Sequence, residues 1–360
     1  MSLQSSACLG ASRILLHASR GEGAARFWSE SDGIVFAGSI GARAVRDRRR
    51  CGSDQPLAID DERYLTRDDG QLKLIDDVAL AARAQSDREV ACYLAPSMDA
   101  RSLPAVCRVL DAGERFLESA DAQAHPAPGY VPVVIRPEFR RALLDDLCAE
   151  LEDRALPIAL MFAASFDPLN SVADVAAARQ LASAVRDGIV LRCDLSAIGL
   201  VAAGLRFGAI GASAELRHVY VPIRRPSAAP RDLSAHVFVP MLRAWMRGSQ
   251  LTYVDETIEL FRCECRVCQG DTVLRFAESG RDDTALRLLA EAHAALAWRD
   301  LAARILERSE ADRLGAWLEE CAAAQQNFRD LRRYGVDLAA PGYLAAWTST
   351  APGRVAQSRS

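Results

Sequence analysis

Three cysteines lie within six residues of one another, and their type and spacing point to metal chemistry. They are Cys263, Cys265 and Cys268. The next histidine along the chain, His293, falls on a segment with a strongly helical pattern. Thiolate sulfur and imidazole nitrogen are the ligands that Zn²⁺ prefers, and four of them close a structural site in a tetrahedron. The spacing therefore predicts a structural zinc site with three ligands from a short loop and the fourth from a helix.

Two other interpretations of the cysteines stay open at this point. A water molecule or another residue could replace His293 as the fourth ligand. The three cysteines could also be buried thiols, because free cysteine packs as a small apolar side chain. A closed metal site mainly holds a fold together, since metal binding is coupled to folding. The metal site alone therefore says little about catalysis.

The C-x-C-x-x-C pattern followed by a helical histidine resembles the zinc site of the tRNA-guanine transglycosylases. In that family, the zinc site belongs to a subdomain inserted late in a TIM barrel. The resemblance implies that Cys263, Cys265, Cys268 and His293 bind zinc. It also implies a barrel enzyme that exchanges guanine or a deazaguanine base in tRNA. Association into a homodimer or a heterodimer is a further implication of the resemblance.

Acidic residues follow two of the apolar segments that read as strands. Asp60 comes directly after residues 56–59, and Asp194 ends a second apolar run. Side chains at the carboxyl ends of barrel strands build the active sites of TIM barrels. Asp60 and Tyr64 also match the first and fifth positions of the D-S-G-G-[FY]-Q motif of the transglycosylases. Asp60 and Asp194 are therefore the predicted catalytic residues, and a purely structural role is the alternative for each.

Two carboxylates suit the chemistry that the resemblance implies. In the transglycosylases, one aspartate attacks the ribose carbon and another carboxylate handles the proton. The family's nucleophile lies in a late strand, and its nearest counterpart here, residues 204–211, contains no carboxylate. We therefore expect catalysis, if the family activity is retained, to use carboxylates at other strand ends.

Short apolar segments alternate with helical patterns through most of the chain. Alternation of this kind is typical of parallel βα units, and continuous apolar strands are typical of sheets that helices cover. A closed barrel and an open doubly wound sheet both fit. No G-x-G-x-x-G motif follows the first strand, which favours a TIM (β/α)8-type barrel with a zinc-binding insert and C-terminal helices. The expected strands are 33–38, 56–59, 89–96, 130–135, 157–162, 189–194 and 207–211, and the expected helices are 102–122, 137–154, 171–186, 196–204, 283–307 and 310–333.

The same pattern predicts four parts along the chain. Residues 1–50 are expected to form an N-terminal segment that enters the barrel, and residues 51–255 the barrel core. Residues 256–345 are expected to form the zinc-binding and helical subdomain. Residues 346–360 are rich in serine and arginine towards the end and are expected to be a disordered tail.

The charge of the chain leaves the kind of partner open. A net charge of −4 on 360 residues neither identifies nor excludes a nucleic-acid-binding protein. Residues 43–50 hold five arginines, and Arg48 and Arg49 are predicted to bind phosphate. The small-residue turn at 211–216 could cradle an anion, with Arg217 adding a guanidinium contact. A solvated surface is the alternative for both segments.

Two functions follow from these patterns. The first is a divergent transglycosylase-like enzyme that exchanges a base on tRNA or, as an alternative substrate, DNA. The second is a catalytically inactive subunit that binds nucleic acid or a catalytic partner. The first ten residues lack the pattern of a signal peptide, and no apolar stretch approaches about 18 residues. We therefore expect a cytoplasmic protein with reduced thiols and no membrane segment.

Overall fold

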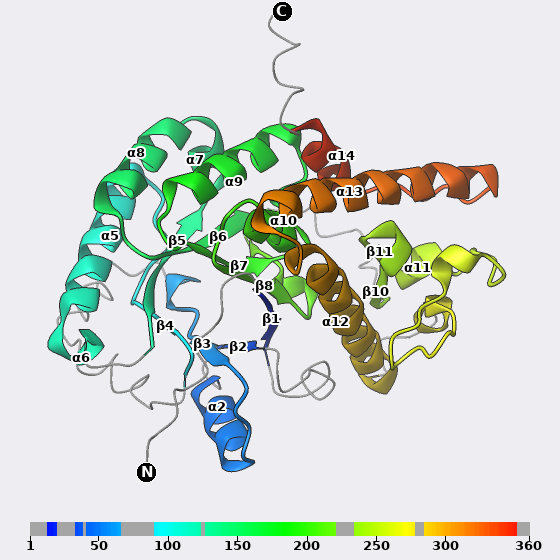
Figure 1. Ribbon diagram of the computed structural model, residues 1–360, viewed down its shortest axis with the longest axis horizontal. Coiled ribbons are helices and arrows are strands. Elements are labelled where there is room, and N and C mark those ends of the chain that lie inside the picture. The colour runs from blue at the N-terminus through cyan, green and yellow to red at the C-terminus, as the bar shows by residue number, and fades with distance from the viewer. Residues whose placement is uncertain are drawn as a thin grey trace, which may run out of the picture.

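Eight parallel strands form a barrel in the computed structural model, which describes residues 13–19, 33–38, 41–65, 90–123, 127–220, 234–277 and 284–350. The strands pair in the order β3-β2-β1-β8-β7-β6-β5-β4. A parallel bridge between Ala58 and Cys92 joins β3 to β4 and closes the ring. The predicted TIM-type barrel is therefore confirmed (Figure 1). Its strands are β1 Arg13–Ala18, β2 Ile34–Ala37, β3 Leu57–Asp60, β4 Tyr93–Leu94, β5 Gly129–Ile135, β6 Ile158–Ala164, β7 Ile189–Cys193 and β8 Phe207–Gly211.

Alternating side chains of the strands fill two separate apolar cores. Along β1, Leu15 belongs to the core inside the barrel, whereas Ile14 and Leu16 belong to the core between the strands and the helices. This alternation follows from the two-residue period of a strand. It turns His17 towards the same side as Leu15, at the carboxyl end of the barrel. We call this end the barrel mouth.

Helices follow the strands around the outside of the barrel (Figure 1). One predicted helix, 137–154, is in fact two, because Leu143 has a non-helical backbone with φ −123° and ψ 19°. Buried Arg140 in the first of the two donates to the carbonyl oxygens of Ile135 and Ala163 and so ties that short helix to the barrel. The helices of the barrel are α2 Gly41–Arg50, α5 Leu103–Glu118, α6 Ala120–Gln123, α7 Pro137–Arg141, α8 Leu144–Arg154, α9 Val172–Ala184, α10 Ser196–Ala202 and α12 Thr284–Leu306.

The segment with the three cysteines is inserted between β8 and α12. Helix α12 packs against β1 and α10, which is the place of the helix after an eighth barrel strand. The insert contains the antiparallel hairpin of β10 (His236–Val239) and β11 (Ala244–Arg247), followed by α11 (Gly248–Leu251). Short 3-10 helices complete this half of the chain: η3 Ala214–Leu216, η4 Pro240–Leu242, η5 Glu259–Phe261 and η6 Val273–Phe276, while η1 Arg63–Leu65 follows β3.

Three of the predicted boundaries need correction. The segment 1–50 already contains β1, β2 and α2, and β10, β11 and α11 belong to the insert although they precede residue 256. The expected tail starts too early, because α14 (Gly342–Ser349) follows α13 (Glu310–Arg333) and packs against it. Trp347 is buried and meets Trp317 edge to face at 5.9 Å. Residues 351–360 lie outside the described part of the chain.

A short strand, β9 (Val219–Tyr220), pairs in parallel with the end of β6 rather than with its neighbour in sequence. The chain therefore crosses the barrel mouth after β8. Among the helices of the described residues, none has the length and apolar character needed to cross a bilayer.

Candidate functional site

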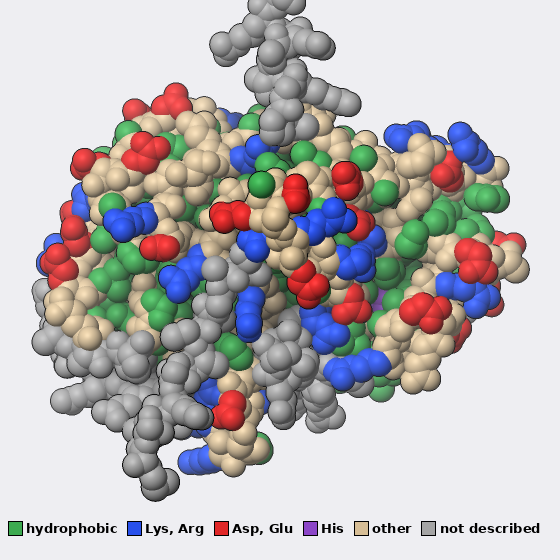
Figure 2. Space-filling model, in the orientation of Figure 1, with side chains coloured by type: hydrophobic (Ala, Val, Ile, Leu, Met, Phe, Trp, Pro, Cys, Tyr) green, Lys and Arg blue, Asp and Glu red, His purple; other side chains and the backbone are tan. Residues whose placement is uncertain are grey.

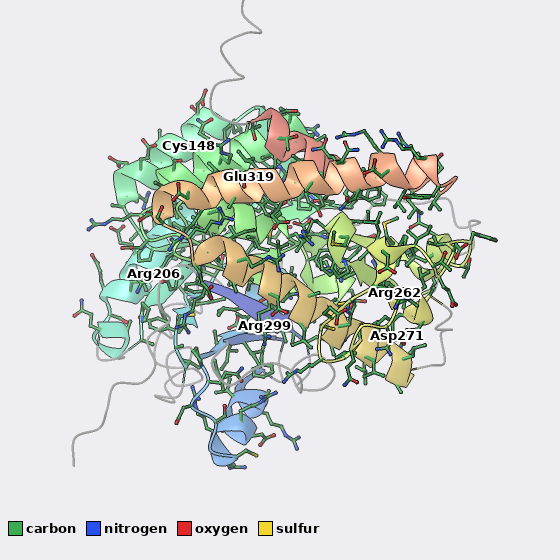
Figure 3. The ribbon with its side chains drawn as sticks, turned by 45° about the vertical axis from the view of Figure 1, so that its right-hand side comes forward. Cys148, Arg206, Arg262, Asp271, Arg299 and Glu319 are labelled. Atoms are coloured by element: carbon green, nitrogen blue, oxygen red, sulfur yellow. The ribbon has the colours of Figure 1, made fainter. Side chains whose placement is uncertain are left out.

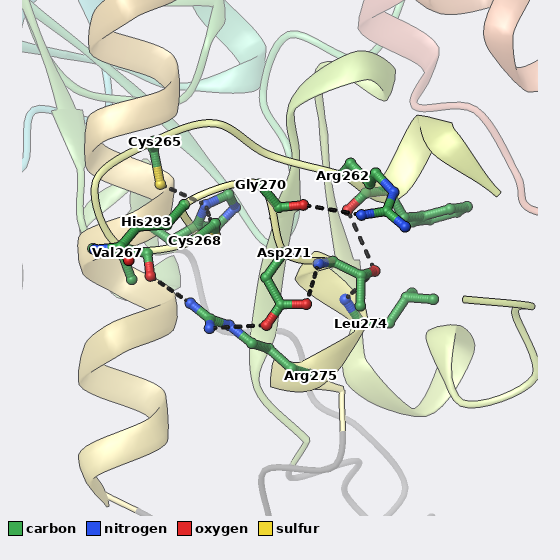
Figure 4. Close-up of polar contacts among 12 residues, drawn as sticks. Arg262, Cys265, Val267, Cys268, Gly270, Asp271, Leu274, Arg275 and His293 are labelled. Carbon is green, nitrogen blue, oxygen red and sulfur yellow. Dashed lines mark hydrogen bonds and ion pairs between the residues drawn. The ribbon is translucent and has the colours of Figure 1, made fainter. Parts of the chain in front are cut away.

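The four predicted metal ligands converge on one point of the insert. Their ligand atoms all lie within 4.8 Å of one another, and all four side chains are buried. Cys263, Cys265 and Cys268 come from the loop after η5, and His293 comes from α12. Figure 4 shows Cys265, Cys268 and His293 in this group. Four such ligands close a tetrahedron and leave no open position, as in structural rather than catalytic sites. The structure therefore contains a buried Cys₃His group that could bind a metal ion.

The backbone of the cysteine loop turns back around the sulfur atoms. The N–H groups of Cys268 and Gln269 donate to the carbonyl of Cys265 at 2.9 and 2.8 Å, and the N–H of Gly270 donates to the carbonyl of Cys263 at 3.0 Å. Gln269 and Gly270 have φ values of 55° and 88°, a region that glycine enters at little cost. The loop therefore reverses immediately after its third cysteine.

His293 is held in one tautomer and one orientation. Its Nδ1 lies 3.2 Å from the sulfur of Cys268 and 3.5 Å from that of Cys265. Its Nε2 donates to the carbonyl oxygen of Phe238 at 2.7 Å. The Nε2 proton leaves Nδ1 with a lone pair that faces the sulfurs, and a metal-binding histidine typically donates its other N–H in this way. Phe276 stacks on the imidazole with a centroid distance of 5.5 Å.

An arginine on η6 supports the cysteine loop from outside. Arg275 donates to the carbonyl of Val267 at 2.6 Å and pairs with Asp271 at 3.2 Å (Figure 4). Arg262 donates to the carbonyl of Gly270 at 3.2 Å. Figure 3 shows Arg262 and Asp271 on the insert, beside the helix that carries Arg299. These contacts hold the loop that carries the three sulfurs.

Asp60 is the centre of a second buried group, inside the barrel mouth. One oxygen, Oδ2, accepts the hydroxyl of Tyr64 at 2.6 Å and Nε of Arg192 at 3.1 Å. Nε2 of His17 lies 3.1 Å from the same oxygen. The other oxygen, Oδ1, accepts the N–H of Glu62 at 3.1 Å. Both oxygens of Asp60 are therefore engaged, and we call these five residues the Asp60 network.

The Asp60 network fixes the charges of its members. Burial alone would raise the pKa of Asp60, but the contact with His17 and the charge of Arg192 outweigh it and lower this pKa. Burial lowers the pKa of His17 more than Asp60 raises it. Burial and Asp60 raise the pKa of Tyr64 well above its usual value. At neutral pH the network therefore holds an ionised carboxylate beside a neutral imidazole and a neutral phenol.

Two members of the Asp60 network have strained backbones. Glu62 and Arg192 have φ values of 61° and 48°, which are uncommon for residues other than glycine. Their side chains form an ion pair, with Arg192 buried and the Glu62 side chain 32% exposed. Backbone strain of this kind persists where the surroundings enforce it, and it clusters at functional sites. Glu62 is thus the member of the network that reaches solvent.

A carboxylate pair lies at the ends of β6 and β7. Asp194 accepts the N–H of Ser196 at 2.8 Å, and Asp167 accepts the N–H of Leu169 at 3.0 Å. Burial, followed by the negative charge of Asp194, raises the pKa of Asp167 well above its usual value. Two neighbouring carboxylates cannot both ionise cheaply, so one keeps its proton. Asp167 therefore keeps its proton to a higher pH than an ordinary aspartate, and Asp194 lies two residues after Arg192, just past the end of β7.

The predicted anion-binding arginines occupy different surroundings from those expected. Arg217 is buried, lies 3.8 Å above the ring of Trp245, and donates to the carbonyl of Gly211 at 3.3 Å. Burial lowers its pKa to about 9. Arg48 and Arg49 lie on α2, away from the mouth, and donate to Gln55 at 3.4 Å and to the Ser53 carbonyl at 2.6 Å. Phosphate binding by these three arginines stays a prediction.

Asp60 and Asp194, which the sequence singled out, both lie at the carboxyl end of the barrel, where they contact residues that were not assigned a role. His17 and Arg192 were missed because each sits in an otherwise apolar strand. A polar residue near the carboxyl end of a barrel strand was the available signal. Asp167 comes three residues after the end of β6, whereas Asp60 is the last residue of β3 and Asp194 directly follows β7.

The comparisons with known proteins do not assign this chain to a family. No family model matches it, and no curated protein matches it. Among solved structures, it is similar to a 1.95 Å crystal structure of a type I 3-dehydroquinate dehydratase from Clostridium difficile with covalently modified comenic acid. The identity is 11%, the match covers 59% of this chain and 88% of that chain, and the TM-score is 0.37. A similarity this weak carries no inference about activity.

Proposed function

We propose that the barrel mouth exchanges a base on the ribose of tRNA or another nucleic acid, by carboxylate catalysis. The supporting observation is that two carboxylates, Asp167 and Asp194, lie together beyond β6 and β7, where burial and the charge of Asp194 raise the pKa of Asp167 well above its usual value. Carboxyl groups whose surroundings move their pKa values apart are suited to different acid and base roles.

In the proposed reaction, the carboxylate of Asp194 attacks the anomeric carbon of the ribose. The bond from this carbon to the outgoing base breaks, and the base nitrogen takes its electron pair and the proton of Asp167. The incoming base then attacks the same carbon and displaces Asp194. The incoming base loses a proton, which returns to Asp167, so atoms and charges balance. The two steps follow the general logic of nucleophilic catalysis with a paired acid.

The Asp60 network is assigned a positioning role in this proposal. Both carboxylate oxygens of Asp60 already accept donors from the protein, so attack by this residue would first break those contacts. Asp60 instead holds Arg192 and Tyr64 at the mouth. A preorganised arrangement of this kind lowers the cost of binding the reacting groups in the correct geometry.

The test measures incorporation of labelled guanine, or of a deazaguanine, into bulk tRNA and into DNA separately. Asp194→Asn should abolish incorporation, and Asp167→Asn should lower the rate by about 10²- to 10⁴-fold. Asp153→Asn, on the exposed face of α8, is the matched control and should keep the full rate. Full incorporation by Asp194→Asn would refute the assignment of the nucleophile. No incorporation by the folded wild-type protein would leave the alternative of an inactive subunit that binds nucleic acid or a catalytic partner.

We also propose that the metal of the Cys₃His group is zinc and that its role is structural. Support comes from the donor set, since three sulfurs and one imidazole suit Zn²⁺ and leave no position for a substrate. The three sulfurs and the imidazole nitrogen lie within 4.8 Å of one another, and the thiolate is the form of cysteine that binds a metal. Elemental analysis of purified protein should give one zinc per chain, and His293→Ala should lower this ratio. A cytoplasmic location, where thiols stay reduced, is part of the same proposal.

A further inference from the structure

Three exposed arginines lie along one face of α2. They are Arg43, Arg46 and Arg50, at positions i, i+3 and i+7 of the helix. Residues at these spacings share a face of an α-helix. Buried Val45 marks the opposite, apolar side, and α2 packs against β2 and β3. We call these three residues the α2 arginine face.

The two other arginines of α2 are held by the loop that follows the helix. Arg48 donates to the side chain of Gln55, and Arg49 donates to the carbonyl oxygen of Ser53. Both residues are half-buried. They therefore anchor the turn into β3, and the outward charge of the helix comes from the α2 arginine face.

The α2 arginine face is only weakly neutralised by the protein. Asp47 is the one acidic residue of α2, and it lies 3.6 Å from Arg43 and 3.9 Å from Arg50. The Arg43 and Arg50 side chains are 81% and 78% exposed. Exposed ion pairs of this kind contribute little stability and are readily exchanged for another anion. Figure 2 shows basic side chains at the surface of α2, which stands out from the barrel.

The geometry of this face fits a nucleic-acid backbone. The seven-residue separation of Arg43 and Arg50 is about 10 Å of α-helix, and three steps between successive phosphates of one strand also rise about 10 Å along the duplex axis. Guanidinium groups bind phosphate through paired N–H donors. A membrane surface fits less well, because membrane-surface helices turn an apolar face into the lipid, and Val45 of α2 is buried against the barrel.

We infer that Arg43, Arg46 and Arg50 bind three phosphates within a run of four successive phosphates of a nucleic-acid strand. This inference rests on the proposed function for the choice of tRNA as the first ligand to test. It places the phosphate contacts on the exposed arginines of α2 rather than on Arg48 and Arg49. Binding there is separate from the carboxylates at the mouth, because α2 lies on the outside of the barrel.

The test measures the affinity for fluorescently labelled bulk tRNA by anisotropy, as a function of salt. Each phosphate contact contributes about 0.7 to 0.9 to the slope of log K against log salt concentration. Replacing all three arginines by glutamine, Arg43→Gln with Arg46→Gln and Arg50→Gln, should therefore reduce the slope by about 2 to 3. Between 50 and 200 mM salt, the wild-type protein should lose about 20- to 40-fold more affinity than the triple variant.

A matched control replaces three exposed arginines elsewhere. Arg329, Arg332 and Arg333 lie at the end of α13, are exposed, and also make contacts with neighbouring side chains. Their triple glutamine variant changes the net charge equally and should keep the wild-type slope. Unchanged thermal unfolding of both triple variants shows that neither has lost its fold.

Three outcomes would overturn the inference. They are an unchanged slope in the α2 variant, an equal loss in the α13 control, and no binding of tRNA by the wild-type protein at 50 mM salt. Preferential binding to phosphatidylserine vesicles, with the same dependence on the α2 arginines, would assign the face to a membrane instead. Asp194→Asn separates this inference from the proposed reaction, because it should lose base exchange and keep the full salt-dependent affinity.

Discussion

Replacing Asp60 by asparagine tests whether the charge at the centre of the Asp60 network is essential to the fold. Asp60 is fully buried, and its partner Arg192 is only 4% exposed. Removing one member of a buried ion pair costs about 3–5 kcal/mol, because the other charge stays buried without compensation. Arg192 keeps Glu62 as a second partner. We therefore expect the lower end of this range, about 3 kcal/mol of unfolding free energy, for Asp60→Asn.

The assay is equilibrium unfolding in urea at pH 7. The slope m is compared between the variants as a check on the two-state analysis. Glu62→Gln serves as the comparison, since its side chain is 32% exposed and a pair that is partly open to solvent should contribute less than a fully buried one. Adding Arg192→Met to Asp60→Asn should recover part of the loss, because the uncompensated charge is removed. A cost below about 1 kcal/mol for Asp60→Asn would refute a charge-dependent network.

Three further predictions concern the metal, the acid pair and two glycines. Chelation of the metal should lower the melting temperature by about 10 °C or more, because several kcal/mol of folding free energy are coupled to the metal and each shifts the midpoint by about 2–4 °C. The pKa of Asp167 is raised in the folded state. Its contribution to the free energy of unfolding is therefore full below the pKa of the unfolded chain and is lost as the pH rises through the folded pKa. Asp167→Asn should therefore be more stable than wild type at pH 7, with the difference vanishing below about pH 4 in acid titrations. Gly211→Ala should lower the free energy of unfolding by about 1–3 kcal/mol, since a Cβ there would lie 2.4 Å from the Leu216 backbone. Gly315→Ala on α13, with open space around it, should raise the free energy of unfolding in urea by up to about 1 kcal/mol.

The barrel could be predicted because each βα unit carries its own local pattern. Strand β1 is missing from the expected strands, since three apolar residues at 14–16 do not distinguish a strand from a turn of helix. In the structure β1 pairs with β8 as well as with β2, so its pairing depends on a distant part of the chain. The strand at 89–96 shortens to Tyr93–Leu94, because only these two residues pair with β5.

The site could be predicted in part, and for a physical reason. Asp60 and Asp194 stand out because an acid directly follows an apolar strand, and the cysteine spacing is local. Arg192 interrupts the run Ile189–Cys193, and its left-handed backbone cannot be anticipated for a residue other than glycine. His17 meets Asp60 only after the barrel has closed. The protonation states of the residues at the mouth depend on contacts of this kind, so the local sequence pattern does not predict them.

The metal group and the barrel mouth are joined by a short series of contacts. His293 donates to the backbone of Phe238 in β10, and Phe238 lies opposite Trp245 in the β10–β11 hairpin. The guanidinium of Arg217 lies over the ring of Trp245, and Arg217 donates to the carbonyl of Gly211 at the end of β8. The negative charge of Asp194 favours the charged form of Arg217. The Cys₃His group in the insert and the carboxylates at the carboxyl end of the barrel are therefore connected by packed residues, and we expect a change in the position of the hairpin to reach the end of β8.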